Sequence, residues 1–98
     1  MAFIEIKNEH QRRSILKALS VMVGFGANHS MVRETCTSFG VGMSNDTIKT
    51  QLYWLEEQGL ISVKSQGNYL IAELKARGQD VVDGLVFIPG IKRPSAGE

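Results

Sequence analysis

The sequence is poor in cysteine, in proline and in long hydrophobic runs. Cys36 is its single cysteine, so no disulfide can form within the chain, which is typical of a reducing compartment. The longest apolar stretches are interrupted or far shorter than the roughly 20 residues that span a bilayer. The first residues lack the basic and apolar regions of a secretory signal. These absences predict a cytoplasmic protein without a transmembrane segment.

The sequence also has almost no excess of positive over negative charge. The net charge is +1, which by itself does not favour binding to nucleic acid. Residues 1–20 carry four cations and two carboxylates, whereas residues 44–59 carry one cation and three carboxylates, which counts against DNA contact there. With 43% hydrophobic and 21% charged residues, the 98 residues predict one globular domain over residues 1–98.

Few residues could carry metal or nucleophilic chemistry. His10 and His29 are far apart in the sequence, and Cys36 has no second cysteine to pair with in a metal site. No spacing typical of zinc ligands or of a nucleophile with its base is present. We therefore expect no enzyme activity, no cofactor and no metal.

Hydrophobic periodicity predicts an α+β domain whose core extends from about residue 8 to residue 83. Residues 1–7 are expected to form an N-terminal arm or strand. Asn8, followed three residues later by Gln11, resembles a capping box that opens the first helix. Gly24 and Gly26 are expected to end this helix. Its apolar residues repeat at helical spacing: Ile15, Leu16, Leu19, Met22 and Val23.

The second expected helix spans residues 31–39, with Ser30 as its cap. The glycine-rich residues 40–43 predict a turn, with Val41 or Met43 packed between two helices. The inward face of the second helix should hold Val32, Thr35, Cys36 and Phe39.

The third expected helix runs from Ser44, its cap, to about Gln58, and Gly59 stops it. Two apolar runs, residues 60–63 and 69–72, then predict a β-hairpin. A last helix is expected at about residues 74–82. Residues 84–98 should form a C-terminal extension, and its polar tail with Lys92, Arg93 and Pro94 should be extended and frayed at its end. The apolar stripe of the third helix is Ile48, Leu52 and Leu55.

Three helices followed by a hairpin is the order of a winged helix-turn-helix, and residues 44–61 make the match specific. This segment is similar to the recognition-helix signature of ArsR-like and MarR-like regulators. In that signature, a capping serine leads to a threonine with a branched apolar residue, and glycine-leucine-isoleucine enters the wing. Residues 74–82 resemble the helix after the wing. The whole chain, including residues 89–94, resembles small regulator-like proteins of Mu-like prophages.

Two features depart from the regulator pattern. The turn over residues 39–44 is about two residues longer than usual, which can alter the angle between the helices that it joins. The cysteine-rich motif of the metal-sensing ArsR members is absent, so metal sensing is not carried over.

The resemblance implies sequence-specific binding of double-stranded DNA by a homodimer that regulates transcription. It places base and phosphate contacts on the third helix at Ser44, Asn45, Asp46, Lys49, Thr50 and Tyr53. It places contacts to the minor groove or its flanking phosphates at Lys64, Gln66 and Asn68 of the hairpin tip. The alternative is that the residues of the third helix and those of the hairpin tip are ordinary solvent-exposed surface residues. Arg12, Arg13 and Lys17 are either phosphate contacts or a charged outer helix face.

The alternative function is a protein-interaction module, in which the third helix meets a protein. The acidic residues Asp46, Glu56 and Glu57 would suit such a partner. A homodimer is expected because both ends of the chain are more apolar than a small monomer would expose. The residues expected at the two-fold axis are Phe3, Ile4, Ile6, Val81, Val82, Leu85, Val86, Phe87 and Ile88.

Overall fold

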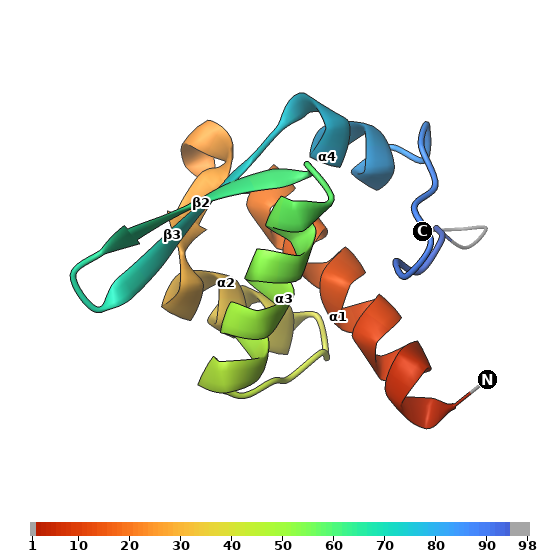
Figure 1. The fold of residues 1–98 in the computed structure, drawn as a ribbon, viewed down its shortest axis with the longest axis horizontal. Helices are drawn as coiled ribbons and strands as arrows, with labels where there is room; N and C mark the ends of the chain where they lie inside the picture. Colours follow the sequence, from red (N-terminus) through yellow and green to blue (C-terminus); the bar gives the residue numbers. More distant parts are fainter. Residues whose placement is uncertain (1, 95–98) are drawn as a thin grey trace.

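The computed structural model describes residues 2–94, which form four α-helices, a short 3-10 helix and a three-stranded antiparallel sheet (Figure 1). The expected α+β class is confirmed, and the element order is compatible with a winged-helix topology. No helix within residues 2–94 is long and apolar enough to cross a membrane. The elements are α1 (Phe3–Ser20), η1 (Val23–Phe25), β1 (Gly26–Asn28), α2 (His29–Ser38), α3 (Asn45–Glu57), β2 (Ile61–Gln66), β3 (Tyr69–Leu74) and α4 (Ala76–Val82).

The first helix begins earlier than predicted. α1 starts at Phe3, so the expected arm or strand over residues 1–7 is wrong where the structure describes it. Asn8 and Gln11 do not form a capping box, because both lie inside the helix. Their side-chain oxygens instead accept hydrogen bonds of 3.0 Å from Nε2 of Gln51 on α3. Two polar residues that resemble a local cap therefore serve a contact between helices.

The first helix also ends earlier than predicted. Ile15, Leu16 and Leu19 are buried as predicted, but the helix ends at Ser20. Met22 and Val23 follow the helix, and Val23 is fully exposed in η1. The predicted inward positions of Met22 and Val23 on this helix are therefore wrong.

A short strand, β1, was not predicted. Ala27 of β1 lies opposite Ala72 in an antiparallel pair with β3, so the sheet order is β1-β3-β2. Three residues are too few to show the alternation by which strands are recognised in a sequence.

The second helix is capped by Asn28, and the prediction that Ser30 caps it is wrong. Oδ1 of Asn28 accepts a hydrogen bond of 2.8 Å from the backbone N–H of Met31. Val32 and Cys36 are fully buried, as predicted. Phe39 follows the helix and is 41% exposed, so its predicted inward position is wrong.

The third helix follows its prediction closely. Oγ of Ser44 accepts a hydrogen bond of 3.1 Å from the backbone N–H of Thr47, which confirms the cap. Gly59 has φ +76°, and its N–H and that of Leu60 close the helix end on carbonyls of the last turn, at 2.9 and 3.2 Å. The predicted stripe is fully buried: Ile48, Leu52 and Leu55.

The predicted hairpin is present, with longer strands. β2 and β3 pair from Ile61 opposite Leu74 to Gln66 opposite Tyr69, so only residues 67 and 68 form the turn. Leu74 ends β3, and α4 therefore begins at Ala76 and not at residue 74.

The C-terminal segment folds back on α1, and Lys92, at the start of the expected extended tail, is held against this helix. Ile91 is 6% exposed, and the backbone N–H of Lys92 donates to the carbonyl of Glu9 at 3.3 Å. Apolar residues of this region pack within the same chain: Val81 is buried, and Val82, Val86 and Ile88 contact the core. The expectation that they meet a second copy is therefore wrong for Val81. Residues 95–98 of the expected frayed end lie outside the described residues.

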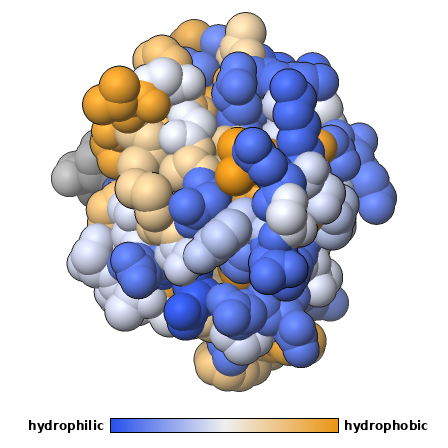
Figure 2. Space-filling view, turned by 90° about the vertical axis from the view of Figure 1, so that its left-hand side faces the viewer, coloured by the Kyte–Doolittle hydropathy of each residue, from blue (hydrophilic) through white to orange (hydrophobic). Residues whose placement is uncertain are grey.

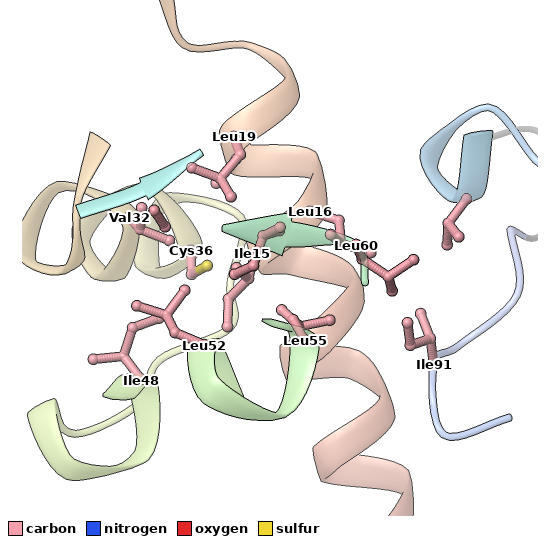
Figure 3. Close-up of a cluster of buried hydrophobic side chains, with 14 of the residues drawn as sticks. Ile15, Leu16, Leu19, Val32, Cys36, Ile48, Leu52, Leu55, Leu60 and Ile91 are labelled. Atoms are coloured by element: carbon pink, nitrogen blue, oxygen red, sulfur yellow. The ribbon is translucent and has the colours of Figure 1, made fainter. Parts of the chain in front are cut away.

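The core is one cluster that draws on α1, α2, α3, the sheet, α4 and the C-terminal segment. In Figure 3 the side chains from α1 point toward those from α2 and α3 and toward Leu60, while Ile91 lies at the edge of the cluster. Packing on three sides holds α3 with its remaining face outward and the hairpin beside it (Figure 1).

Candidate nucleic-acid interface

The exposed face of α3 carries most of the predicted contact residues. Asn45, Asp46 and Thr50 are exposed, and Tyr53 is 46% exposed. The Thr50 hydroxyl donates to the carbonyl of Asp46 at 3.0 Å, and Ser44 is engaged as the cap. These two hydroxyls are therefore committed to the helix, and the remaining side chains are available to a partner.

A groove lies between α3 and the hairpin tip, with a volume of about 350 Å³. We call it the α3–hairpin groove. It brings together three of the predicted contact residues, Lys49 and Tyr53 from α3 and Asn68 from the turn. Its lining residues are Lys49, Tyr53, Ser65, Gly67, Asn68, Tyr69 and Leu70.

Lys64 and Gln66, although predicted as contacts, do not line this groove. Successive side chains of a strand point to opposite faces. Ile61 points into the core and Ser65 into the groove, so Lys64 and Gln66 point to the other face of the hairpin. Both are exposed there. Figure 2 looks onto the side of the molecule where the hairpin tip lies, and this side is mostly hydrophilic, with hydrophobic surface gathered at its upper left.

The acidic residues counted near α3 lie mainly at its far end. Glu56 is in the last turn, where its Oε2 accepts a hydrogen bond of 2.9 Å from the backbone N–H of Val63. Glu57 is the last residue of the helix. Asp46 lies in the first turn, where a carboxylate stabilises the positive end of the helix dipole. The acidic balance of residues 44–59 therefore does not describe the groove, which no carboxylate lines.

His29 lies beside the groove and was missed as a site residue. It is 5% exposed, its Nδ1 accepts a hydrogen bond of 3.1 Å from the backbone N–H of Leu70, and its ring centroid is 5.5 Å from that of Tyr69. Burial lowers the pKa of His29, and the positive charges of Lys49 and Arg33 lower it further. Lys49 of α3 and Arg33 of α2 therefore both place positive charge near this ring.

Arg33 was also missed. It lies one turn after His29 on α2, and its Nε is buried without a hydrogen-bond partner within residues 2–94. The spacing of His29 and Arg33, four residues apart on one helix face, was the available signal. Nothing in the sequence places that face next to Lys49.

Arg12 and Lys17 of α1 serve contacts within the molecule. The Arg12 guanidinium lies 3.8 Å from the centre of the Trp54 ring and donates to Oε1 of Gln51 at 2.8 Å and to the Gly90 carbonyl at 3.0 Å. Arg13 is buried, which contradicts its expected place on an exposed face. Lys17 Nζ lies 5.3 Å from the centre of the Phe39 ring. Arg12 thereby links α3 to the C-terminal segment.

Within residues 2–94 no group of three or more His, Cys, Asp or Glu side chains could hold a metal ion. Cys36 is fully buried, and burial raises its pKa to about 12. The thiol is therefore protonated near neutral pH and unsuited to act as a nucleophile.

No family model matches the chain. It is 33% identical over 90 residues to the uncharacterized protein gp26 of Escherichia phage Mu, covering 92% of this chain and 93% of gp26. It is 35% identical over 78 residues to an uncharacterized protein of Haemophilus influenzae, covering 79% of this chain and 76% of that protein. These relatives confirm the expected kinship with a Mu-like phage, and neither indicates an ArsR-like or MarR-like regulator. With this identity over nearly the full length of both proteins, the chain belongs to the family of phage Mu gp26.

Proposed function

We propose that this protein binds double-stranded DNA through a winged helix-turn-helix. α2 and α3 would form the helix-turn-helix, α3 would enter the major groove, and the β2-β3 hairpin would act as the wing. The order of three helices and a hairpin, with β1 completing the sheet, supports this assignment.

The observation that carries the proposal is the α3–hairpin groove. A recognition helix must present its first turns outward beside positive charge, because phosphate contacts supply much of the affinity for DNA. Asn45, Asp46 and Lys49 occupy those first turns, and Lys49 and Asn68 both line the groove. Any base reading would come from the first turns, and backbone contacts from the groove.

We further propose that the protein acts as a homodimer that regulates transcription, in the cytoplasm where DNA is accessible. A two-fold pair would present two copies of α3 to neighbouring major grooves. The surface that supports a dimer is the start of α1, where Phe3 and Ile4 are 75% and 61% exposed.

The same surface supports the second candidate, a protein-interaction module. Phe3 and Ile6 line a groove of about 350 Å³ with Val41 of the α2–α3 connection. A groove that combines such apolar residues with the polar side chains of Lys7, His10 and Gln11 also fits a segment of another protein. In that case α3 would not need to touch DNA.

An electrophoretic mobility shift with random-sequence duplex at low salt separates these candidates. Non-specific binding by a DNA-binding domain falls in the range of about 10⁻⁴ to 10⁻⁶ M, so the wild type should retard the duplex at tens of micromolar. Asn45→Ala should weaken discrimination between sequences by about 1 to 3 kcal/mol if Asn45 reads a base. Absence of retardation by the folded protein would overturn the DNA proposal and favour the protein-interaction module.

A further inference from the structure

We infer that the α3–hairpin groove binds a phosphate of the DNA backbone, with Lys49 and Arg33 supplying its positive charge. The inference rests on the proposed function and deepens it. It assigns Lys49 to the phosphate backbone and not to a base edge, and it adds Arg33 of α2 to the interface.

The groove has the chemistry of an anion site. The residues that line it include Lys49, Tyr53, Ser65 and Asn68, whose ammonium, hydroxyl and amide groups can donate hydrogen bonds. No carboxylate lines it. A phosphodiester accepts hydrogen bonds and carries one negative charge, so it complements each of these groups.

Arg33 adds a second cation from a different element. Its buried Nε has no hydrogen-bond partner within residues 2–94, and a buried donor of a charged group is costly unless an acceptor meets the cation. Lys49 and Arg33 both act on the His29 ring, which contacts Tyr69 and Leu70 of the groove wall. The positive charge therefore comes from α2 and α3, and the hairpin supplies the opposite wall of the groove.

Lys49 lies in a different place on α3 from the residues proposed to contact base edges. Asn45 and Asp46 lie at the first turn of α3 and are exposed away from the hairpin groove, whose lining excludes them. Lys49 lies a turn later, beside the hairpin. A phosphate seated between α3 and the hairpin would fix the register of the helix in the major groove, while Asn45 and Asp46 remain available to base edges.

The test measures the affinity for a random-sequence duplex by fluorescence anisotropy over a series of salt concentrations. Lys49→Gln removes the cation that lines the groove, and Arg33→Gln removes the neighbouring cation of α2. Lys75→Gln and Arg77→Gln are matched controls, because these residues are exposed at the start of α4, away from the hairpin tip (Figure 1). Thermal melts check that each variant is folded.

Each groove variant should reduce the slope of log K against log salt by about 0.9, which corresponds to about an eightfold loss of affinity at about 0.1 M salt. The loss should be the same for every duplex sequence. The two controls should keep the wild-type slope. If the wild type binds duplex but both groove variants keep its slope, the phosphate site is wrong and the DNA proposal stands. If the wild type binds no duplex, both are overturned.

Histidine NMR supplies a second readout that does not depend on the stability of a variant. A phosphate beside Lys49 and Arg33 offsets their charge, so duplex should raise the pKa of His29 in the wild type. Inorganic phosphate alone, at matched ionic strength, distinguishes a backbone phosphate from a free anion. A rise with inorganic phosphate but not with duplex would overturn the inference, and so would an unchanged titration with duplex.

Discussion

At the scale of single residues, His29 couples the fold to pH. Its Nδ1 accepts a hydrogen bond from Leu70, which requires the neutral ring, and it is 5% exposed. The charged groups that act on it are Lys49 from α3 and Arg33 from its own helix, and Tyr69 contacts it from the hairpin. Protonation of the ring would therefore break a buried hydrogen bond and place a third positive charge beside two others.

The free energy of unfolding should fall as the pH falls below about 6.5. Burial, with Lys49 and Arg33, lowers the pKa of His29 in the folded state, so the unfolded chain binds more protons in this range. Each unit by which the pKa of His29 is lowered adds about 1.4 kcal/mol to the free energy of unfolding. This stabilisation is fully present above the pKa of the unfolded state and is lost as the pH falls through the pKa of the folded state. Urea unfolding between about pH 5 and 8 measures the slope. His29→Gln should flatten it, with exposed His10→Gln as the control, and an unaltered slope in His29→Gln would contradict this account.

Cys36 should behave as a core residue. It is fully buried, and burial raises its pKa to about 12, so the reactive thiolate is scarce near neutral pH. Labelling by a thiol reagent at about pH 8 should be slow in the native protein and rapid in denaturant, and its rate in the native state should follow unfolding. Equal labelling rates with and without denaturant would show that the thiol is accessible in the folded state.

At the scale of elements, α4 depends on a close approach at Gly78. A Cβ at this position would overlap the backbone carbonyl oxygen of Leu60, which precedes β2, and the side chain of Leu74. Because a backbone atom cannot move aside cheaply, only glycine fits. The carbonyl of Leu60 also accepts a hydrogen bond of 3.0 Å from the N–H of Lys75, so the start of α4 is held at the same point.

Gly78→Ala should therefore destabilise the protein by about 1 to 3 kcal/mol, although alanine is the better helix former by about 1 kcal/mol. Gly42→Ala is the matched control. A Cβ at Gly42 meets nothing within 4 Å and its φ is not positive, so this variant should be unchanged or slightly more stable. Chemical denaturation of both variants measures the difference. Equal stability of the two would rule out the close approach.

At the scale of the whole molecule, the start of α1 is the surface most suited to a second copy. The buried residues of α1 begin at Gln11, and the turns before it expose Phe3, Ile4 and Ile6. This end of α1 extends beyond the rest of the chain at the lower right of Figure 1. Leu85 and Phe87, 73% and 53% exposed, are the other expected interface residues that remain uncovered.

Ile4→Glu should weaken the proposed dimer. In a two-fold interface one substitution acts twice, so losing the burial of one isoleucine per copy costs about 3 kcal/mol, or about 100-fold in the dissociation constant. Val21→Glu is the matched control, because Val21 is exposed at the other end of α1. Sedimentation equilibrium measures the association. A monomeric wild type at high micromolar concentration, or an equal loss in Val21→Glu, would contradict a dimer through the start of α1.

The sequence by itself determined the features that depend on local periodicity and local hydrogen bonds. The stripe of Ile48 and Leu55, the Ser44 cap, the stop at Gly59 and the hairpin could all be predicted, because a helix or a turn is specified by residues a few positions apart. From the same features, the third helix could be predicted as the face that contacts a partner.

Only the tertiary structure decided which of those elements meet. Asn8 and Gln11 form a network with Gln51, which is distant in the sequence. Arg33 and Lys49 both act on His29 because α2 and α3 pack on one core. The folding back of Ile91 depends on the same packing. No local pattern encodes these contacts, because burial of apolar surface is non-directional and the partners are selected by how all the elements pack together.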